Sequence, residues 1–212
     1  MSSDPTLRRW VVALVLSAAA IGLSIAYLDV PVAVFLDTHL RHTQFWVGLN
    51  FALHPLPLLV IGALFFLLGC GVWLIAGRSL RLSAEVPLLC SWATIWAVAA
   101  EHIGKRIFGR GWPDPTFVRE HLSGFHFLHG ETHWNSFPSG TALISFAVLA
   151  VLWMVRPRWR TGSSIIAAVI LAAVVLGNYH WLSDLIAGAF LGACIGCCTV
   201  KLLYPLRITR EK

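Results

Sequence analysis

The chain has 212 residues, of which 58% are hydrophobic and only 12% are charged, and its mean hydropathy is +0.75. A soluble domain carries about twice that charged fraction, so the composition excludes an ordinary soluble protein and indicates an integral membrane protein. We interpret the net charge of +6 first as an indication of how the chain is oriented in the membrane, because basic residues gather in cytoplasmic loops. It gives no reason to expect a nucleic-acid partner.

Six apolar stretches reach or approach the length of about 20 residues that a helix needs to cross a bilayer. They lie at about residues 10–27, 58–76, 84–104, 138–155, 163–178 and 181–200. No alternating apolar pattern typical of strands recurs along the chain. We therefore predict an all-α protein, a six-transmembrane-helix bundle that forms a single integral membrane domain over residues 1–212.

The basic residues orient this bundle. Eleven of them fall at the two termini and in the second and fourth connections: Arg8, Arg9, Arg78, Arg81, Arg156, Arg158, Arg160, Lys201, Arg207, Arg210 and Lys212. The other side of the bundle receives five, which are Arg41, Lys105, Arg106, Arg110 and Arg119. The asymmetry predicts cytoplasmic termini and two long outer loops in a bacterial-type inner (cell) membrane.

The stretch at residues 177–188 places an imidazole and a carboxylate four positions apart, where an apolar run restarts. His180 and Asp184 would lie one helical turn apart. The carboxylate can accept the proton of one ring nitrogen, which leaves the other nitrogen as a base or a nucleophile. Ionisable residues at the edge of a membrane span indicate function.

Two further stretches reach the same outer face in the predicted topology. In Pro138-Ser139-Gly140 a proline begins a helix, whose first amides would face outward and favour an anion such as phosphate. A plain helix start is the alternative. Lys105, Arg106 and Arg110 lie within six positions at a span exit. They form either a clamp for a phosphoryl group or side chains that extend to lipid headgroups.

In this order and spacing, the three stretches resemble the motifs of the type 2 phosphatidic acid phosphatase (PAP2) superfamily, which lie on a six-helix bundle. The resemblance covers residues 105–192. The family pattern Lys-x6-Arg-Pro is matched by Lys105 and Pro113. Its Pro-Ser-Gly-His is matched by Pro138, Ser139 and Gly140, and its Ser-Arg-x5-His-x3-Asp by His180 and Asp184.

The sequence departs from the family at several motif positions. Trp112 stands where the first motif has arginine, and Thr141 stands where the second has histidine. Ala173 and Val174 replace the serine and arginine of the third. General acid catalysis, which the family assigns to the histidine, is worth roughly 10²–10⁴-fold in rate.

The resemblance implies a lipid phosphatase that hydrolyses a lipid phosphate or diphosphate at the non-cytoplasmic face. His180 would attack phosphorus and form a phosphohistidine, with Asp184 orienting it. Lys105, Ser139, Gly140 and Thr141 would bind the substrate phosphate, and Arg110 could compensate for an absent arginine. The alternatives are a catalytically impaired relative that binds lipid phosphate or a membrane partner, and a lipid phosphotransferase.

The outer loop before Pro138 is rich in histidine, and its residues His121, His126, His129, Glu131 and His133 carry three open interpretations. His133 is the candidate stand-in for the missing acid. A second interpretation is that these histidines are solvated loop residues. A third is that His129, Glu131 and His133 bind zinc. The prediction we adopt has no metal and no cofactor. On the helix before Lys105, the four-residue spacing of Glu101 and Lys105 indicates an intrahelical ion pair.

Overall fold

The computed structural model describes residues 5–41, 43–45, 48, 56–76, 84–122, 124–128 and 132–203. The regular elements there are helices, apart from one isolated β-bridge between Arg110 and Phe125. This confirms the predicted all-α class. In order they are α1 (Pro5–Leu23), η1 (Ser24–Leu28), α2 (Asp29–Leu40), α4 (Leu56–Ile75), α5 (Glu85–Phe108), η3 (Pro113–Phe117), α6 (Val118–Glu120), η4 (Thr132–Trp134), α7 (Gly140–Val155), η5 (Pro157–Trp159), α8 (Arg160–Leu176) and α9 (Leu182–Leu203).

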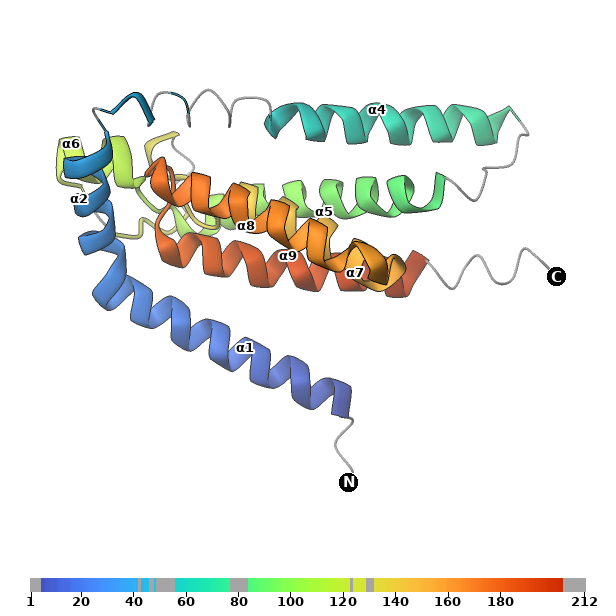
Figure 1. Ribbon diagram of the computed structural model, residues 1–212, viewed down its shortest axis with the longest axis horizontal. Helices are drawn as coiled ribbons and strands as arrows, with labels where there is room; N and C mark the ends of the chain where they lie inside the picture. The colour runs from blue at the N-terminus through green and yellow to red at the C-terminus, as the bar shows by residue number, and fades with distance from the viewer. Residues whose placement is uncertain are drawn as a thin grey trace.

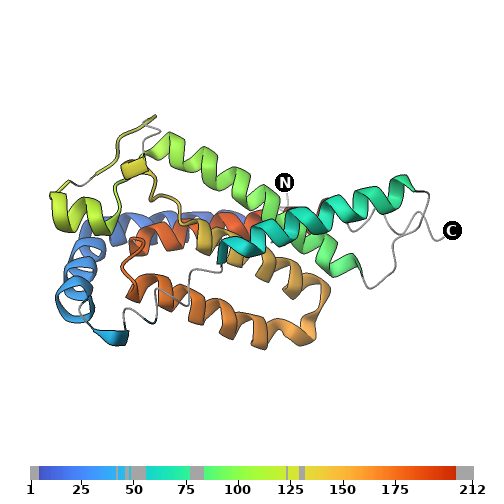
Figure 2. The same cartoon turned by 90° about the horizontal axis from the view of Figure 1, so that it is seen from above.

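Helices α4, α5, α7, α8 and α9 run roughly along the long axis of the molecule (Figures 1 and 2). α2 stands across one end of this bundle, and α1 leaves it at an angle. The end of α5, the starts of α7 and α9, and the short α6 gather at that same end. The bundle thereby brings together three stretches that are far apart in sequence.

Four helical segments are long and apolar enough to cross a membrane, namely Leu7–Leu40, Glu85–Phe108, Pro157–Leu176 and Leu182–Leu203. The protein is therefore an integral membrane protein. The apolar helices Val60–Ile75 and Gly140–Val155, which coincide with the second and fourth predicted spans, are shorter than this length. The count of six spans stays a prediction.

The first apolar segment bends at η1, a short π-helical turn. The Asp29 amide donates to the Ser24 carbonyl across this turn, and the Ser24 hydroxyl donates to the Asp29 carboxylate at 2.7 Å. Inserted π turns are a common cause of helix bends, and they recur at functional sites. Because of the bend, the axes of α1 and α2 point in different directions (Figure 1). Asp29, at the bend, is almost fully buried, at 2% exposure.

Helices α7 and α9 make the closest contact in the bundle because glycines spaced four apart line α9. A β-carbon at Gly188 would lie 2.5 Å from the Ser139 carbonyl oxygen. At Gly192 and Gly196 it would overlap the carbonyl oxygens of Leu143 and Ala147. Small residues at this spacing let helix backbones approach each other where lipid supplies no hydrophobic force. This contact fixes the start of α9 beside the start of α7.

We expect Gly192→Val to lower the free energy of unfolding by about 1–3 kcal/mol, because its side chain must displace the α7 backbone. Thermal unfolding of the purified protein in detergent measures the change. Gly62→Val on α4 is the matched control, since no atom lies within 4 Å of a β-carbon there. An equal midpoint for both variants would contradict the close packing.

Candidate functional site

A buried guanidinium at the centre of the site connects the N-terminal helical segment to the start of α9. Arg110 Nη1 donates to Asp184 Oδ1 at 2.6 Å and to Ser183 Oγ at 2.5 Å. Its Nη2 donates to Asp29 Oδ2 at 2.7 Å. Arg110 is 6% exposed and Asp184 is fully buried. One cation therefore lies between two carboxylates in a region that water hardly reaches.

Local structure delivers each member of this cluster. Helix α5 ends at Gly109, whose left-handed φ of 52° turns the chain sharply so that Arg110 follows directly. Asp29 comes from the π bend, and Asp184 lies in the first turn of α9. A tight turn of this hand suits glycine, which has no β-carbon to clash.

The remaining hydrogen-bonding capacity of the Asp29 carboxylate is used. Asp29 accepts from the Ser24 hydroxyl and from both the amide and the hydroxyl of Ser183. The Arg110 guanidinium lies over the rings of Phe125 and Trp181, with its central carbon 4.9 and 5.0 Å from their centroids. Removing one partner from such a buried group leaves an uncompensated charge, which costs about 3–5 kcal/mol.

The hydrogen bonds around His180 fix which ring nitrogen carries the proton. Ser136 Oγ donates its single proton to Asp184 Oδ2 at 2.5 Å, and it lies 3.4 Å from His180 Nδ1. That hydroxyl can then only accept from the ring, so we assign the ring proton to Nδ1. Asp184 Oδ2 also lies 3.5 Å from the same nitrogen. The lone pair of His180 is therefore on Nε2.

At the start of α7, one of the three consecutive residues predicted to bind phosphate uses its amide elsewhere. Ser139 caps the helix by accepting from the Ala142 amide, and its own amide donates to the Asp184 carbonyl oxygen at 3.1 Å. The amides left without an intrahelical acceptor are those of Gly140 and Thr141. They lie at the positive end of the helix dipole, where anions are favoured.

Lys105 lies beside this helix start, in the ion pair with Glu101 that the sequence predicts. Its Nζ is 2.5 Å from Glu101 Oε1 and 5.6 Å from the centroid of the Trp112 ring. The Trp112 ring in turn lies 4.8 Å, between centroids, from that of His180. The indole is therefore close to both the cation and the imidazole.

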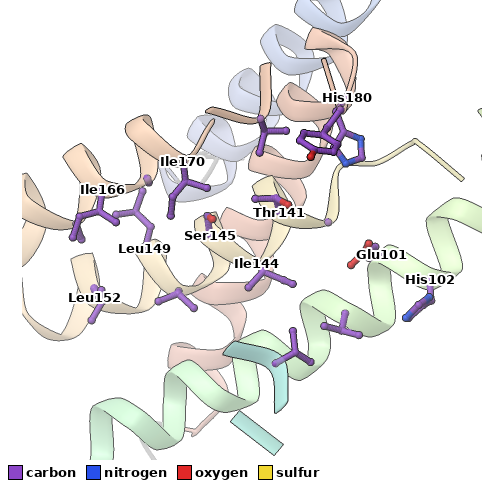
Figure 3. A pocket seen from close by; sticks show the side chains of 18 of the residues that line it. Glu101, His102, Thr141, Ile144, Ser145, Leu149, Leu152, Ile166, Ile170 and His180 are labelled. Carbon is purple, nitrogen blue, oxygen red and sulfur yellow. The ribbon is translucent and has the colours of Figure 1, made fainter. Parts of the chain in front are cut away.

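An apolar cavity of about 820 Å³ opens beside His180 and extends between α5, α7 and α8 (Figure 3). Its polar end is lined by Glu101, His102, Trp112, Thr141 and His180. Its far end is lined by aliphatic side chains such as Leu152 and Ile166. Tyr179 also lines it, and burial raises the pKa of its phenol, so the hydroxyl stays neutral at physiological pH.

The other predicted residues lie outside the cavity lining. His133 is exposed, in η4, with its carbonyl oxygen accepting from the Thr116 hydroxyl. Arg106, His121 and His126 are also exposed. His129 and Glu131 lie outside the described residues, and within the described part of the chain no three His, Cys, Asp or Glu side chains form a metal-binding group.

Sequence reasoning missed Ser136 and Asp29. Ser136 lies two residues before Pro138 in a loop, where a serine carries no pattern of its own. Asp29 gave a stronger signal, because it is an ionisable residue inside an apolar stretch. Its partner is 81 positions away, so the sequence alone could not pair them.

The fold and the site define a class, the helical integral membrane proteins with a buried histidine–carboxylate pair beside the N-terminus of a helix. The PAP2 superfamily matches residues 86–208, and the chain belongs to this superfamily. Membership indicates a membrane phosphatase. No curated protein and no solved structure matches the chain.

We expect Arg110→Ala to lower the free energy of unfolding by about 3–5 kcal/mol, because it leaves Asp29 and Asp184 buried without their cation. Thermal or chemical unfolding in detergent measures the loss. Arg106→Ala removes an exposed cation from the same segment and should change stability by less than about 0.5 kcal/mol. Wild-type stability of the Arg110 variant would show that the bridge contributes nothing.

We expect Ser136→Ala to release the ring of His180 from a single tautomer. In the wild type, ¹⁵N spectra of histidine-labelled protein should show a protonated Nδ1 and an unprotonated Nε2 in the neutral ring. In the variant Nδ1 loses its closer partner and keeps only the Asp184 carboxylate at 3.5 Å, so the share of the Nε2-protonated tautomer should rise. An Nε2-protonated wild-type ring would overturn the assignment.

Proposed function

We propose that this protein is a membrane lipid phosphatase that hydrolyses a lipid phosphate or diphosphate through a covalent phosphohistidine at His180. The observation that carries the proposal is the placement of this histidine. Its Nδ1 faces Ser136 and Asp184, and the residue itself lines an apolar cavity. A base held in one tautomer beside a lipid-sized space suits attack on a phosphorylated lipid headgroup.

The nucleophile is supported by the buried network behind it. Attack by Nε2 makes the ring of His180 cationic, because Nδ1 keeps its proton. Asp184 stabilises that cation through the ring proton, and Arg110 and Ser136 hold the carboxylate in place. The proposed nucleophile is thus oriented by a hydrogen-bond acceptor, Asp184, and the acceptor is held in place by two further side chains.

The phosphoryl group would bind between Lys105 and the first turn of α7. The Gly140 and Thr141 amides and the Lys105 ammonium would supply charge-assisted hydrogen bonds to its oxygens. Gly140 and Thr141 line the same cavity as His180. We assign Arg110 a different role from the predicted phosphate contact, because its guanidinium binds two carboxylates and is buried. It positions Asp184.

The cavity supports a lipid as the substrate. Its volume falls in the range of small-molecule sites, about 300–1,000 Å³, and its walls beyond Thr141 are mostly aliphatic. A hydrocarbon chain would bury apolar surface there, while the phosphate stays at the polar end. A diphosphate is the easier substrate, because its phosphate leaving group departs with less need of protonation than an alcohol does.

The orientation in the membrane belongs to the same proposal. Arg156, Arg158 and Arg160 lie at or beside the connection between α7 and α8, at the opposite end of these helices from His180. If this basic end is cytoplasmic, the site faces the exterior or the periplasm.

A second candidate function is a relative that has lost hydrolysis and binds lipid phosphate or a membrane partner. Trp112, Thr141 and Val174 favour it, because they replace two cations and an acid of the family motifs. Val174 is buried among apolar side chains, so nothing at that position restores a charge. A lipid phosphotransferase is the third candidate, which keeps His180 and uses an acceptor other than water.

We expect wild-type protein incubated with ³²P-labelled phosphatidate in detergent micelles to acquire an acid-labile, alkali-stable label and to release phosphate. His180→Asn should abolish both, since an amide cannot attack phosphorus. His121→Asn is the matched control. Residue 121 is exposed, and asparagine tolerates its left-handed φ of 55°.

Binding of phosphatidate without label or release would favour the impaired relative. Label that is discharged only when an acceptor lipid is added would favour the phosphotransferase. Unchanged release by His180→Asn would refute the histidine mechanism.

A further inference from the structure

Glu101 places a carboxyl group at the polar end of the cavity, against the start of α7. A β-carbon at Gly140 would overlap both oxygens of this carboxyl group, so the group lies directly beside that helix start. Figure 3 shows it projecting from α5 toward α7, on the side of the cavity that holds Thr141 and His180. The side chain is 16% exposed.

This position is the one that a substrate phosphoryl group would approach under the proposed function. Lys105 is paired with Glu101 at 2.5 Å, and the same cation is a proposed phosphate ligand. When a phosphoryl dianion binds, Lys105 can transfer its contact to the phosphoryl oxygens. Glu101 is then left without its cation and directly beside the bound phosphoryl group.

The other side chains near the cavity are less suited to supply a proton. The Thr141 hydroxyl is a very weak acid, and His180 is occupied as the nucleophile. His102 is exposed and projects away from α7 (Figure 3). His133, the acid suggested by the sequence, is exposed and outside the described cavity lining.

We propose that Glu101 is the general acid of this enzyme, taking the role left open by Thr141; the inference rests on the proposed phosphatase function. The lone pair of His180 Nε2 forms a bond to phosphorus while the bond to the leaving-group oxygen breaks. That oxygen takes the Glu101 proton, so the alcohol leaves neutral and Glu101 becomes a carboxylate. In the second step water attacks phosphorus while the bond from phosphorus to His180 Nε2 breaks, and its electron pair returns to Nε2. One proton of the water passes to Glu101, inorganic phosphate is released, and both side chains regain their starting states.

The test compares two leaving groups in Glu101→Gln, which keeps the shape of the side chain and cannot supply a proton. The alkoxide of dodecyl phosphate is a poor leaving group and must be protonated as it departs. The phenolate of 4-nitrophenyl phosphate is a good leaving group and departs without protonation. The rate of His180 phosphorylation is measured in a single turnover, so that the later hydrolysis does not contribute. Each rate is expressed relative to wild type on the same compound.

We expect Glu101→Gln to slow phosphorylation by dodecyl phosphate about 10²–10⁴-fold, the usual contribution of a general acid, and to slow phosphorylation by 4-nitrophenyl phosphate less than about tenfold. Glu120→Gln, which changes an exposed carboxylate on α6, should leave both rates unchanged. If Glu101→Gln fails to fold, Glu101→Asp should show the same selective loss to a smaller extent.

Equal losses on the two compounds would reduce Glu101 to a partner of Lys105 and overturn the proposal. So would a selective loss in His133→Gln with none in Glu101→Gln. The proposed function fails if the wild type acquires no label from either compound. It also fails if His180→Asn acquires label. In both cases the inference about Glu101 fails as well.

Discussion

The contact between the Arg110 guanidinium and the carboxylates of Asp29 and Asp184 is the interaction on which the arrangement of the site depends. It joins the N-terminal helical segment, the end of α5 and the start of α9 at one buried point. Two carboxylates cannot be buried side by side without a cation, and a cation cannot be buried without acceptors. The chain satisfies both requirements with one side chain, and it fills the remaining acceptor positions with serine hydroxyls and backbone amides.

Through Asp184, the same interaction acts on the His180 ring. Because Arg110 and the Ser136 hydroxyl fix this carboxylate, the His180 ring has one favourable tautomer, with its lone pair on Nε2. The close contact of α7 with α9 through glycines then sets the helix start beside the same imidazole. Asp29 takes part in this network although it lies outside residues 86–208, which match the superfamily. The N-terminal helices are therefore part of the site as well as of the membrane anchor.

One departure from the family motifs lies beside His180. Trp112 occupies the place of a family arginine and packs on His180, while Lys105 pairs with Glu101. An aromatic ring therefore stands in place of the family arginine, and the neighbouring Lys105 is paired with a carboxyl group. Such a combination is consistent with a site that keeps its nucleophile and changes how charge and protons are supplied around it.

The sequence by itself determined the all-α class, the membrane environment, the superfamily and the ion pair of Glu101 with Lys105. The superfamily follows from the match over residues 86–208. The other three follow from composition, from apolar run length or from short spacings that a helix fixes locally. Only the tertiary structure decided that Arg110 binds Asp29 and Asp184, that Ser136 lies behind His180, and that the Ser139 amide is taken by the Asp184 carbonyl oxygen. The physical reason is that these contacts join residues 44 to 81 positions apart. Their partners depend on how helices pack and where each one ends, which no local pattern encodes.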